Sequence, residues 1–163
     1  MSLMIDPREI PAEGLDLSGT LPASTFDLPE GDIARAKSPL EYDLHILRDG
    51  SDVFLTGSLA ATFELQCGRC AEMYPHRVEL DGYAQEVPLE NEGPIDLTNW
   101  LREDILLALP TQPRCETGNV SPRECPADGR FEPAPDSAEP APHEPDSKDV
   151  WGSLDQLTNL KRN

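Results

Sequence analysis

Residues 40–67 read LEYDLHILRDGSDVFLTGSLAATFELQC, and this stretch decides the fold. Apolar residues occupy alternate positions on both sides of Asp49-Gly50, as in strands with one buried face. Asp-Gly is a preferred pair for a two-residue type I′ turn, because both turn positions need a positive φ. The stretch therefore predicts an antiparallel β-hairpin.

The turn also predicts the register of the hairpin, because loop length decides which residues face each other. The expected pairs are Arg48 with Ser51, Ile46 with Val53, Leu44 with Leu55, and Tyr42 with Gly57. Each pair places its side chains on the same face. Turn chemistry and hydrophobic period therefore agree.

Three further segments complete the expected β-structure. A third strand is predicted at about residues 74–87, with a bulge at Gly82-Tyr83, where the alternation breaks. Residues 15–21 are a candidate for a shorter strand. Residues 31–39 are expected to form a loop or a single helical turn.

The hydrophobic period then changes to that of a helix. Asp96 is the expected N-cap of a helix over residues 97–109, which Pro110 and Pro113 end. Its apolar face comprises Leu97, Trp100, Leu101, Ile105 and Ala108. Three more leucines widen the apolar surface beyond what one sheet contact needs, namely Leu106, Leu107 and Leu109. We expect an α+β fold: an antiparallel meander, or a barrel-like closure of it, packed by one main helix.

Composition divides the 163 residues into four parts. We expect a flexible N-terminus at 1–14 and the α+β domain with its cysteines at 15–125. Residues 126–148 are rich in proline and poor in large apolar residues, which predicts a disordered linker. Residues 149–163 predict a short amphipathic helix that is too short to be stable alone. It is expected to use Trp151 and three leucines to dock on the domain, and the alternative is reversible capture of a partner.

A formal net charge of −18 argues against a general nucleic-acid binder, since phosphate contacts need clustered lysine and arginine. No apolar run has membrane-spanning length, and no secretory leader opens the sequence. We therefore expect a cytoplasmic protein with no membrane partner. Thiols stay reduced in that compartment, which favours metal binding over disulfides.

Four cysteines give the strongest chemical signal. Cys67 and Cys70 enclose a Gly-Arg turn at the end of the long strand, and Cys115 and Cys125 follow the helix. A C-x-x-C pair offers two thiolates to one tetrahedral ion, and structural Zn²⁺ usually takes four such ligands. We expect all four to bind one Zn²⁺ in a zinc-knuckle-like site, with His76 as the substitute ligand.

Other interpretations of the cysteines stay open. Cys67 lies in phase with Leu65, so it also fits a buried core thiol. Cys115 and Cys125 also fit unconstrained loop thiols. The C-x-x-C pair occurs in thiol-disulfide redox proteins too, but there the first cysteine usually begins a helix, whereas this pair links two strands.

Basic residues gather near the cysteines. Four of only thirteen lie there: Arg69, Arg77, Arg114 and Arg123. One interpretation is a small patch that contacts RNA phosphates. The other is charge compensation, because Zn²⁺ with four thiolates carries a formal double negative charge.

The carboxylates near the helix are the only candidates for acid–base catalysis. Asp96, Glu103 and Asp104 have no histidine or substrate-shaped motif beside them, so a solvated helix face is the better interpretation. No phosphate-binding glycine loop is present. We expect a protein that is not an enzyme and has no small-molecule substrate.

Two stretches together resemble the large ribosomal RNA subunit accumulation protein family (YceD-type). They are LQCGRC at 65–70 and residues 95–110, which end in ILLALP. The later cysteines and the tail at 151–161 resemble the end of that family. The resemblance implies a non-catalytic role in the synthesis, processing or stability of 23S ribosomal RNA. The implied partner is the rRNA precursor, a ribosomal protein or an assembly particle.

Two rival functions remain at this stage. One is a C-x-x-C redox protein, and the other is an acidic protein-interaction adaptor without an RNA role.

Overall fold

The structure is a computed structural model that describes residues 2–89 and 93–129. All of them except Gly129 belong to one compact unit, Met1–Asp128. The strands are β1 (Met4–Ile5), β2 (Leu15–Leu21), β3 (Ala34–Ala36), β4 (Leu40–Asp49), β5 (Asp52–Gln66), β6 (Met73–Pro88) and β7 (Ile95–Asp96). The helices are α1 (Thr98–Leu107) and the 3-10 turns η1 (Pro7–Glu9), η2 (Ala23–Phe26) and η3 (Cys115–Thr117).

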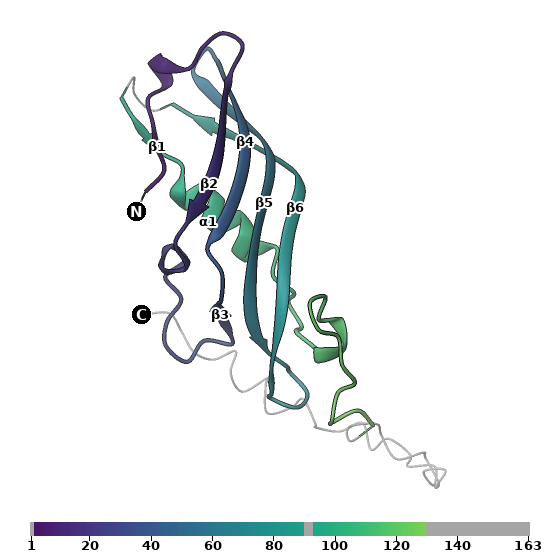
Figure 1. Cartoon of the computed structure of the whole chain (residues 1–163). Coiled ribbons are helices and arrows are strands. Elements are labelled where there is room, and N and C mark those ends of the chain that lie inside the picture. Colours follow the sequence, from purple (N-terminus) through teal and green to yellow (C-terminus); the bar gives the residue numbers. More distant parts are fainter. Residues whose placement is uncertain (1, 90–92, 130–163) are drawn as a thin grey trace, which may run out of the picture. The chain divides into compact units, whose positions relative to one another are not determined.

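Five strands form one antiparallel sheet around β5 (Figure 1). β6 pairs with one side of β5 along its whole length, and β4 and then β3 share the other side. β2 pairs with β4 and forms the far edge. Within the described residues β2 and β6 do not pair with each other, so the sheet is open and no barrel closes. The expected antiparallel α+β fold is confirmed in this open form.

The hairpin at Gly50 has a register two residues away from the expected one. Asp49 pairs with Asp52 and Ile46 with Leu55, so the two loop residues are Gly50 and Ser51. Gly50 has a φ of 60° and Ser51 has no positive φ, which fits a II′ rather than a I′ turn. The expected pairing was wrong, but a shift of two keeps every side chain on its predicted face.

The other strands follow the sequence in part. The strand at 15–21 is present as β2, and the bulge in β6 is confirmed, since the register shifts opposite Gly57–Leu59 at Asp81-Gly82. The interpretation of 31–39 as a loop or helical turn was wrong. Ala34 to Ala36 form β3 instead, because β5 extends beyond β4 and offers Phe63 to Leu65 as a partner.

The helix is shorter than the hydrophobic pattern predicts. α1 starts at Thr98, and Leu97 occupies the N-cap position. Asp96, the expected N-cap, is instead the last residue of β7, where it pairs with Met4 of β1. Asp96 still caps the helix, since its carboxylate accepts a hydrogen bond from the Thr98 N–H at 2.9 Å. Pro110 disfavours helical backbone at the residue before it, and α1 ends at Leu107.

The helix lies across one face of the sheet, and the core lies between them (Figure 1). Leu97, Leu101 and Ile105 are fully buried, as predicted, whereas Ala108 is exposed. The sheet contributes alternate residues of each long strand, including Leu40, Leu44, Ile46, Val53, Leu55, Leu59, Ala61, Phe63 and Leu65. The opposite face of the sheet has no covering element in the described part of the chain.

The N-terminal segment, expected to be flexible, is part of this fold. β1 pairs with β7, the Leu97 N–H donates to the carbonyl oxygen of Leu3 at 2.9 Å, and Ile5 is buried. The folded unit also continues past Cys125 to Asp128. The rest of the expected linker and the amphipathic helix at 149–163 lie outside the described residues. None of the described helices is long and apolar enough to span a membrane.

Gly57 provides a direct test of the sheet. It has a φ of 145°, and a Cβ added there would lie 2.0 Å from the carbonyl oxygen of Asp43 on β4. Gly57→Ala should therefore destabilise the protein by about 2–4 kcal/mol, measured by urea unfolding. Gly82→Ala is the matched control, because a Cβ there meets no atom within 4 Å. Equal effects of the two changes would contradict the β4–β5 register.

Candidate metal centre

The first half of the centre is the turn that links β5 to β6. Cys67 follows β5 in phase with Leu65, so it points into the core and is only 2% exposed. The turn is closed by two hydrogen bonds of 2.9 Å, from the Ala71 N–H to the Cys67 carbonyl and from the Cys67 N–H to the Glu72 carbonyl. Ala71 has a φ of 61°, which reverses the chain immediately after Cys70.

The second half is the segment after α1. The Gly68 N–H donates to the carbonyl oxygen of Pro113 at 2.9 Å, which holds this segment against the turn. Cys115 lies two residues after Pro113 and begins η3. Cys125 lies farther along, where the Asp128 N–H donates to its carbonyl oxygen at 2.9 Å. Figure 1 shows η3 beside the β5–β6 turn. Both cysteines are buried.

The four sulfur atoms lie within 4.8 Å of one another. Cys115 Sγ is 3.5 Å from Cys67 Sγ and 3.8 Å from Cys70 Sγ, and Cys67 Sγ is 3.9 Å from Cys125 Sγ. Four sulfurs at about 2.3 Å from a shared tetrahedral ion would lie about 3.8 Å apart. All four are free thiols. The cluster is therefore close enough to hold one metal ion.

The surroundings favour different protonation states at two of these thiols. Burial raises the pKa of Cys67, but backbone N–H donors of Cys70, Arg69 and Cys115 outweigh burial and lower that pKa to about 6. Burial and the neighbouring thiols raise the pKa of Cys115 to about 12. One thiolate is thus stabilised by the fold alone, whereas a thiolate at Cys115 needs a cation beside it.

His76, the expected substitute ligand, is not a member of the cluster. Burial lowers the pKa of its imidazole, which favours the neutral form. The four cysteines already offer four sulfur atoms to one ion without it.

Three of the four arginines near the cysteines form ion pairs. Arg69 contacts Asp128 at 2.8 Å and Glu116 at 3.3 Å, so it bridges the turn to the later segment. Arg123, on the later segment, contacts Glu72, at the end of the turn, at 2.6 Å and makes a second bridge between them. The sequence offered one signal for these pairs, because Glu116 adjoins Cys115 and Glu72 follows Cys70 by two residues.

The other two arginines are placed differently. Arg77 lies on the uncovered face of the sheet, between Glu41 at 2.8 Å and Glu79 at 2.7 Å. Arg114 precedes Cys115 and forms no ion pair with any described residue. Of the four, Arg114 therefore keeps the most freedom to contact a phosphate group.

Two structural residues were missed by sequence reasoning. Asn119 uses its side-chain amide to bind the backbone of Arg77, and Tyr83 donates a hydrogen bond to the Asp104 carboxylate at 2.9 Å. Neither contact has a local sequence signal, because each joins positions far apart in the chain. The second contact gives Asp104 a structural partner.

Neither a protein-family model nor a solved structure matches this chain.

The Arg69 bridge gives a quantitative prediction. Arg69→Gln should lower the unfolding free energy by about 0.2–1 kcal/mol at low salt, because the partners are partly exposed. A double-mutant cycle with Asp128→Asn should give a coupling energy of similar size that vanishes in 1 M salt. The matched control pairs Arg69→Gln with Asp16→Asn on β2. Coupling in the control but not with Asp128 would contradict the bridge.

Proposed function

We propose that the four cysteines bind one Zn²⁺ as thiolates in a structural site. A tetrahedral set of four sulfurs is typical of zinc or iron–sulfur chemistry, and a single buried centre of this size fits one zinc ion. Three of the thiols are buried and only Cys70 is partly exposed. With four protein ligands no position is left for water or substrate, which distinguishes a structural centre from a catalytic one.

Removal of the metal is the test of this centre. Protein purified without added metal or chelator should contain one zinc per chain by elemental analysis. Chelation, or Cys125→Ser, should lower the unfolding free energy by on the order of 5 kcal/mol, because metal binding contributes to folding. Ser121→Ala, in the same loop, is the control. A zinc-free protein with four titratable thiols would overturn the assignment.

The chain itself acts as a non-catalytic factor that supports accumulation of large-subunit (23S) ribosomal RNA. The observation that carries this proposal is that the structure brings the two YceD-like stretches close together. The stretch at 95–110 contains α1 and is followed by Cys115, which lies beside Cys67 and Cys70 of the stretch at 65–70. A factor of this type acts by binding in the cytoplasm.

The described hollows support binding over catalysis. A hollow of about 670 Å³ between η2 and β3 is lined by Asp27, Glu30 and Arg35 together with small and apolar residues. Its lining contains no histidine or cysteine.

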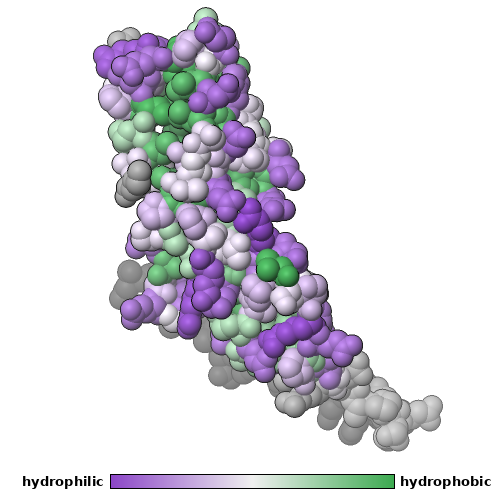
Figure 2. All heavy atoms as spheres, in the orientation of Figure 1, coloured by the Kyte–Doolittle hydropathy of each residue, from purple (hydrophilic) through white to green (hydrophobic). Residues whose placement is uncertain are grey.

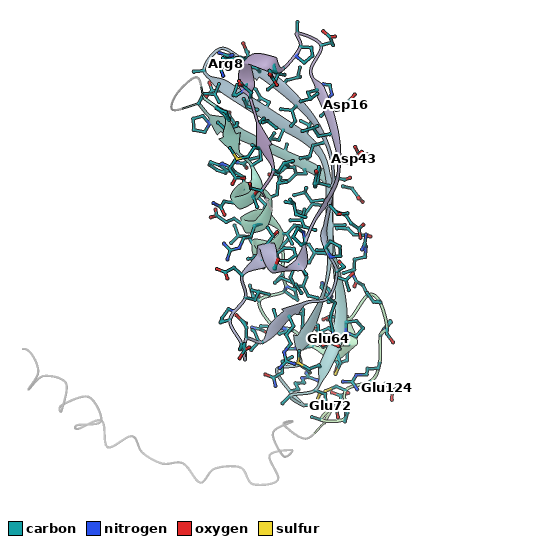
Figure 3. The ribbon with its side chains drawn as sticks, turned by 60° about the vertical axis from the view of Figure 1, so that its left-hand side comes forward. Arg8, Asp16, Asp43, Glu64, Glu72 and Glu124 are labelled. Carbon is teal, nitrogen blue, oxygen red and sulfur yellow. The ribbon has the colours of Figure 1, made fainter. Side chains whose placement is uncertain are left out.

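The uncovered face of the sheet favours a protein component of the assembly particle as the direct partner. Acidic side chains on this face include Asp16 from β2, Glu41 and Asp43 from β4, and Glu79, Asp81 and Glu86 from β6. Figure 2 shows hydrophilic side chains along the β6 side of this face, and Figure 3 shows Asp16 and Asp43 pointing away from α1. Such a face repels an RNA backbone and attracts a basic polypeptide.

The redox alternative has one observation in its favour, the lowered pKa of Cys67. Its burial counts against it, because a redox nucleophile must be reachable by its partner. A Cys67–Cys70 disulfide that forms and is reduced by a reductase would restore the redox alternative.

Loss of this chain from its host cell should lower mature 23S rRNA, because the assembly step lacks its binding factor. Wild type and Ser121→Ala should restore the rRNA, and the double variant Cys70→Ser/Cys125→Ser should not. Quantitative RNA blots measure the outcome. Unchanged rRNA after deletion would overturn the ribosomal role and favour the adaptor alternative.

Crosslinking in cells then identifies the partner. The acidic face predicts crosslinks to a basic ribosomal or assembly protein that are lost in Asp43→Lys/Glu79→Lys. Direct RNA contact predicts RNA crosslinks that fall in Arg114→Ala and persist in Arg35→Ala, which removes an exposed arginine elsewhere.

A further inference from the structure

The outer side of β6 is a strand edge, because no described strand pairs with it there. In an antiparallel pair, the N–H and C=O groups of alternate residues point toward the partner strand. Those of Arg77 point away from β5, because they bind Asn119 instead. The neighbouring residues of the same phase, Pro75 and Glu79, face the same way. Such an edge is a template for another strand.

Asn119 occupies this edge in the manner of a partner strand. The Arg77 N–H donates to the Asn119 side-chain oxygen at 2.8 Å, and the Asn119 side-chain NH₂ donates to the Arg77 carbonyl at 2.7 Å. Gly118, the residue before Asn119, also lies close to β6, since a Cβ added to it would be 3.4 Å from the Pro75 carbonyl oxygen. Pro75 has no N–H, so the loop and the proline together close the edge around Arg77.

The loop that carries Asn119 is held at its two ends by cysteines of the metal centre. Cys115 and Cys125 flank residues 116–124, and within that range only Gly118 is buried. The Gly118 N–H donates to the Cys115 carbonyl at 3.3 Å, which links Asn119 directly to the first anchor. A segment with so little buried surface depends on its anchors for order.

We propose that the metal centre gates the β6 edge. With metal bound, Asn119 caps the backbone of Arg77 and the edge is closed. Without metal, the two anchors separate, the loop leaves, and the edge at residues 75–79 opens to strand addition. The inference rests on the proposed metal centre and assigns it a consequence beyond stability.

The open edge fits an extended basic polypeptide. Glu79, Asp81 and Glu86 lie along β6, which forms this edge of the sheet. A strand that adds to β6 gains backbone hydrogen bonds from the edge and places every second side chain near these carboxylates. The net charge of −18 disfavours a second copy of this chain in the same place.

Amide hydrogen exchange tests the gate. The Arg77 amide should exchange at least tenfold faster in Asn119→Ala that retains its zinc than in wild type or in Val120→Ala, the adjacent exposed control. Metal-stripped, reduced protein should show the same acceleration while the Ile46 and Leu55 amides stay protected. If stripping unfolds the sheet as well, the zinc-loaded Asn119→Ala variant alone decides.

A binding measurement tests the occupant. A labelled ten-residue peptide of alternating valine and lysine should bind zinc-loaded Asn119→Ala at least tenfold more tightly than wild type, and a valine–glutamate peptide should not. Unchanged Arg77 exchange in Asn119→Ala overturns the gate, and equal binding of both peptides overturns the basic occupant. Absence of zinc from the purified protein overturns the metal centre instead, so the two failures are distinguishable.

Discussion

The alternation of side chains along β5 is the constraint on which the rest of the structure depends. This strand pairs with β4, β3 and β6, and its odd-numbered residues lie on the face of the sheet that α1 covers. Cys67 continues the same phase one step beyond the strand, so the core of the sheet and the cysteine cluster are continuous. A change of phase in β5 would turn both the apolar core and Cys67 toward solvent.

The order of the C-terminal segment depends on the cluster much more than on packing. Between Arg114 and Gly129 the buried residues are Cys115, Gly118, Cys125 and Ala127. The ion pairs that join this segment to the turn are partly exposed and contribute about 0.2–1 kcal/mol each. A tetrathiolate zinc centre contributes on the order of 10 kcal/mol of binding free energy. Under the proposal of a zinc centre, a bound metal would therefore be the interaction that decides whether the segment, and Asn119 with it, stays on the sheet.

Charged residues are distributed differently near the cysteines and on the uncovered face of the sheet. Near the cysteines, Arg69 pairs with Glu116 and Asp128, and Arg123 pairs with Glu72. On the uncovered face of the sheet, Arg77 is outnumbered by acids from three strands. The arginines thus stabilise the fold around the centre, and the excess negative charge is left on a face that a basic partner can cover.

Much of the fold was predictable because it depends on local periodicity. The alternation in β4 and β5 predicted their buried faces, the Gly82 break predicted the bulge, and the spacing of Leu97, Leu101 and Ile105 predicted the buried side of α1. The cysteine pattern also predicted that all four cysteines belong to one site. A local pattern cannot choose between registers that differ by two residues, since both bury the same side chains, and so the Gly50-Ser51 turn was missed.

Tertiary structure alone decided the remaining features, because each joins segments that are distant in sequence. β3 forms because β5 extends beyond the end of β4, and the N-terminal strand β1 forms because β7 pairs with it. The four thiols meet because the Pro113 carbonyl oxygen accepts a hydrogen bond from the Gly68 N–H. Asn119 reaches Arg77 across 42 positions for the same reason. Sequence by itself determined which residues are buried and which can bind metal, through period and residue chemistry. Where those residues meet was decided only by the packing of β5, β6 and the loop after α1, since long-range contacts leave no periodic trace in the chain.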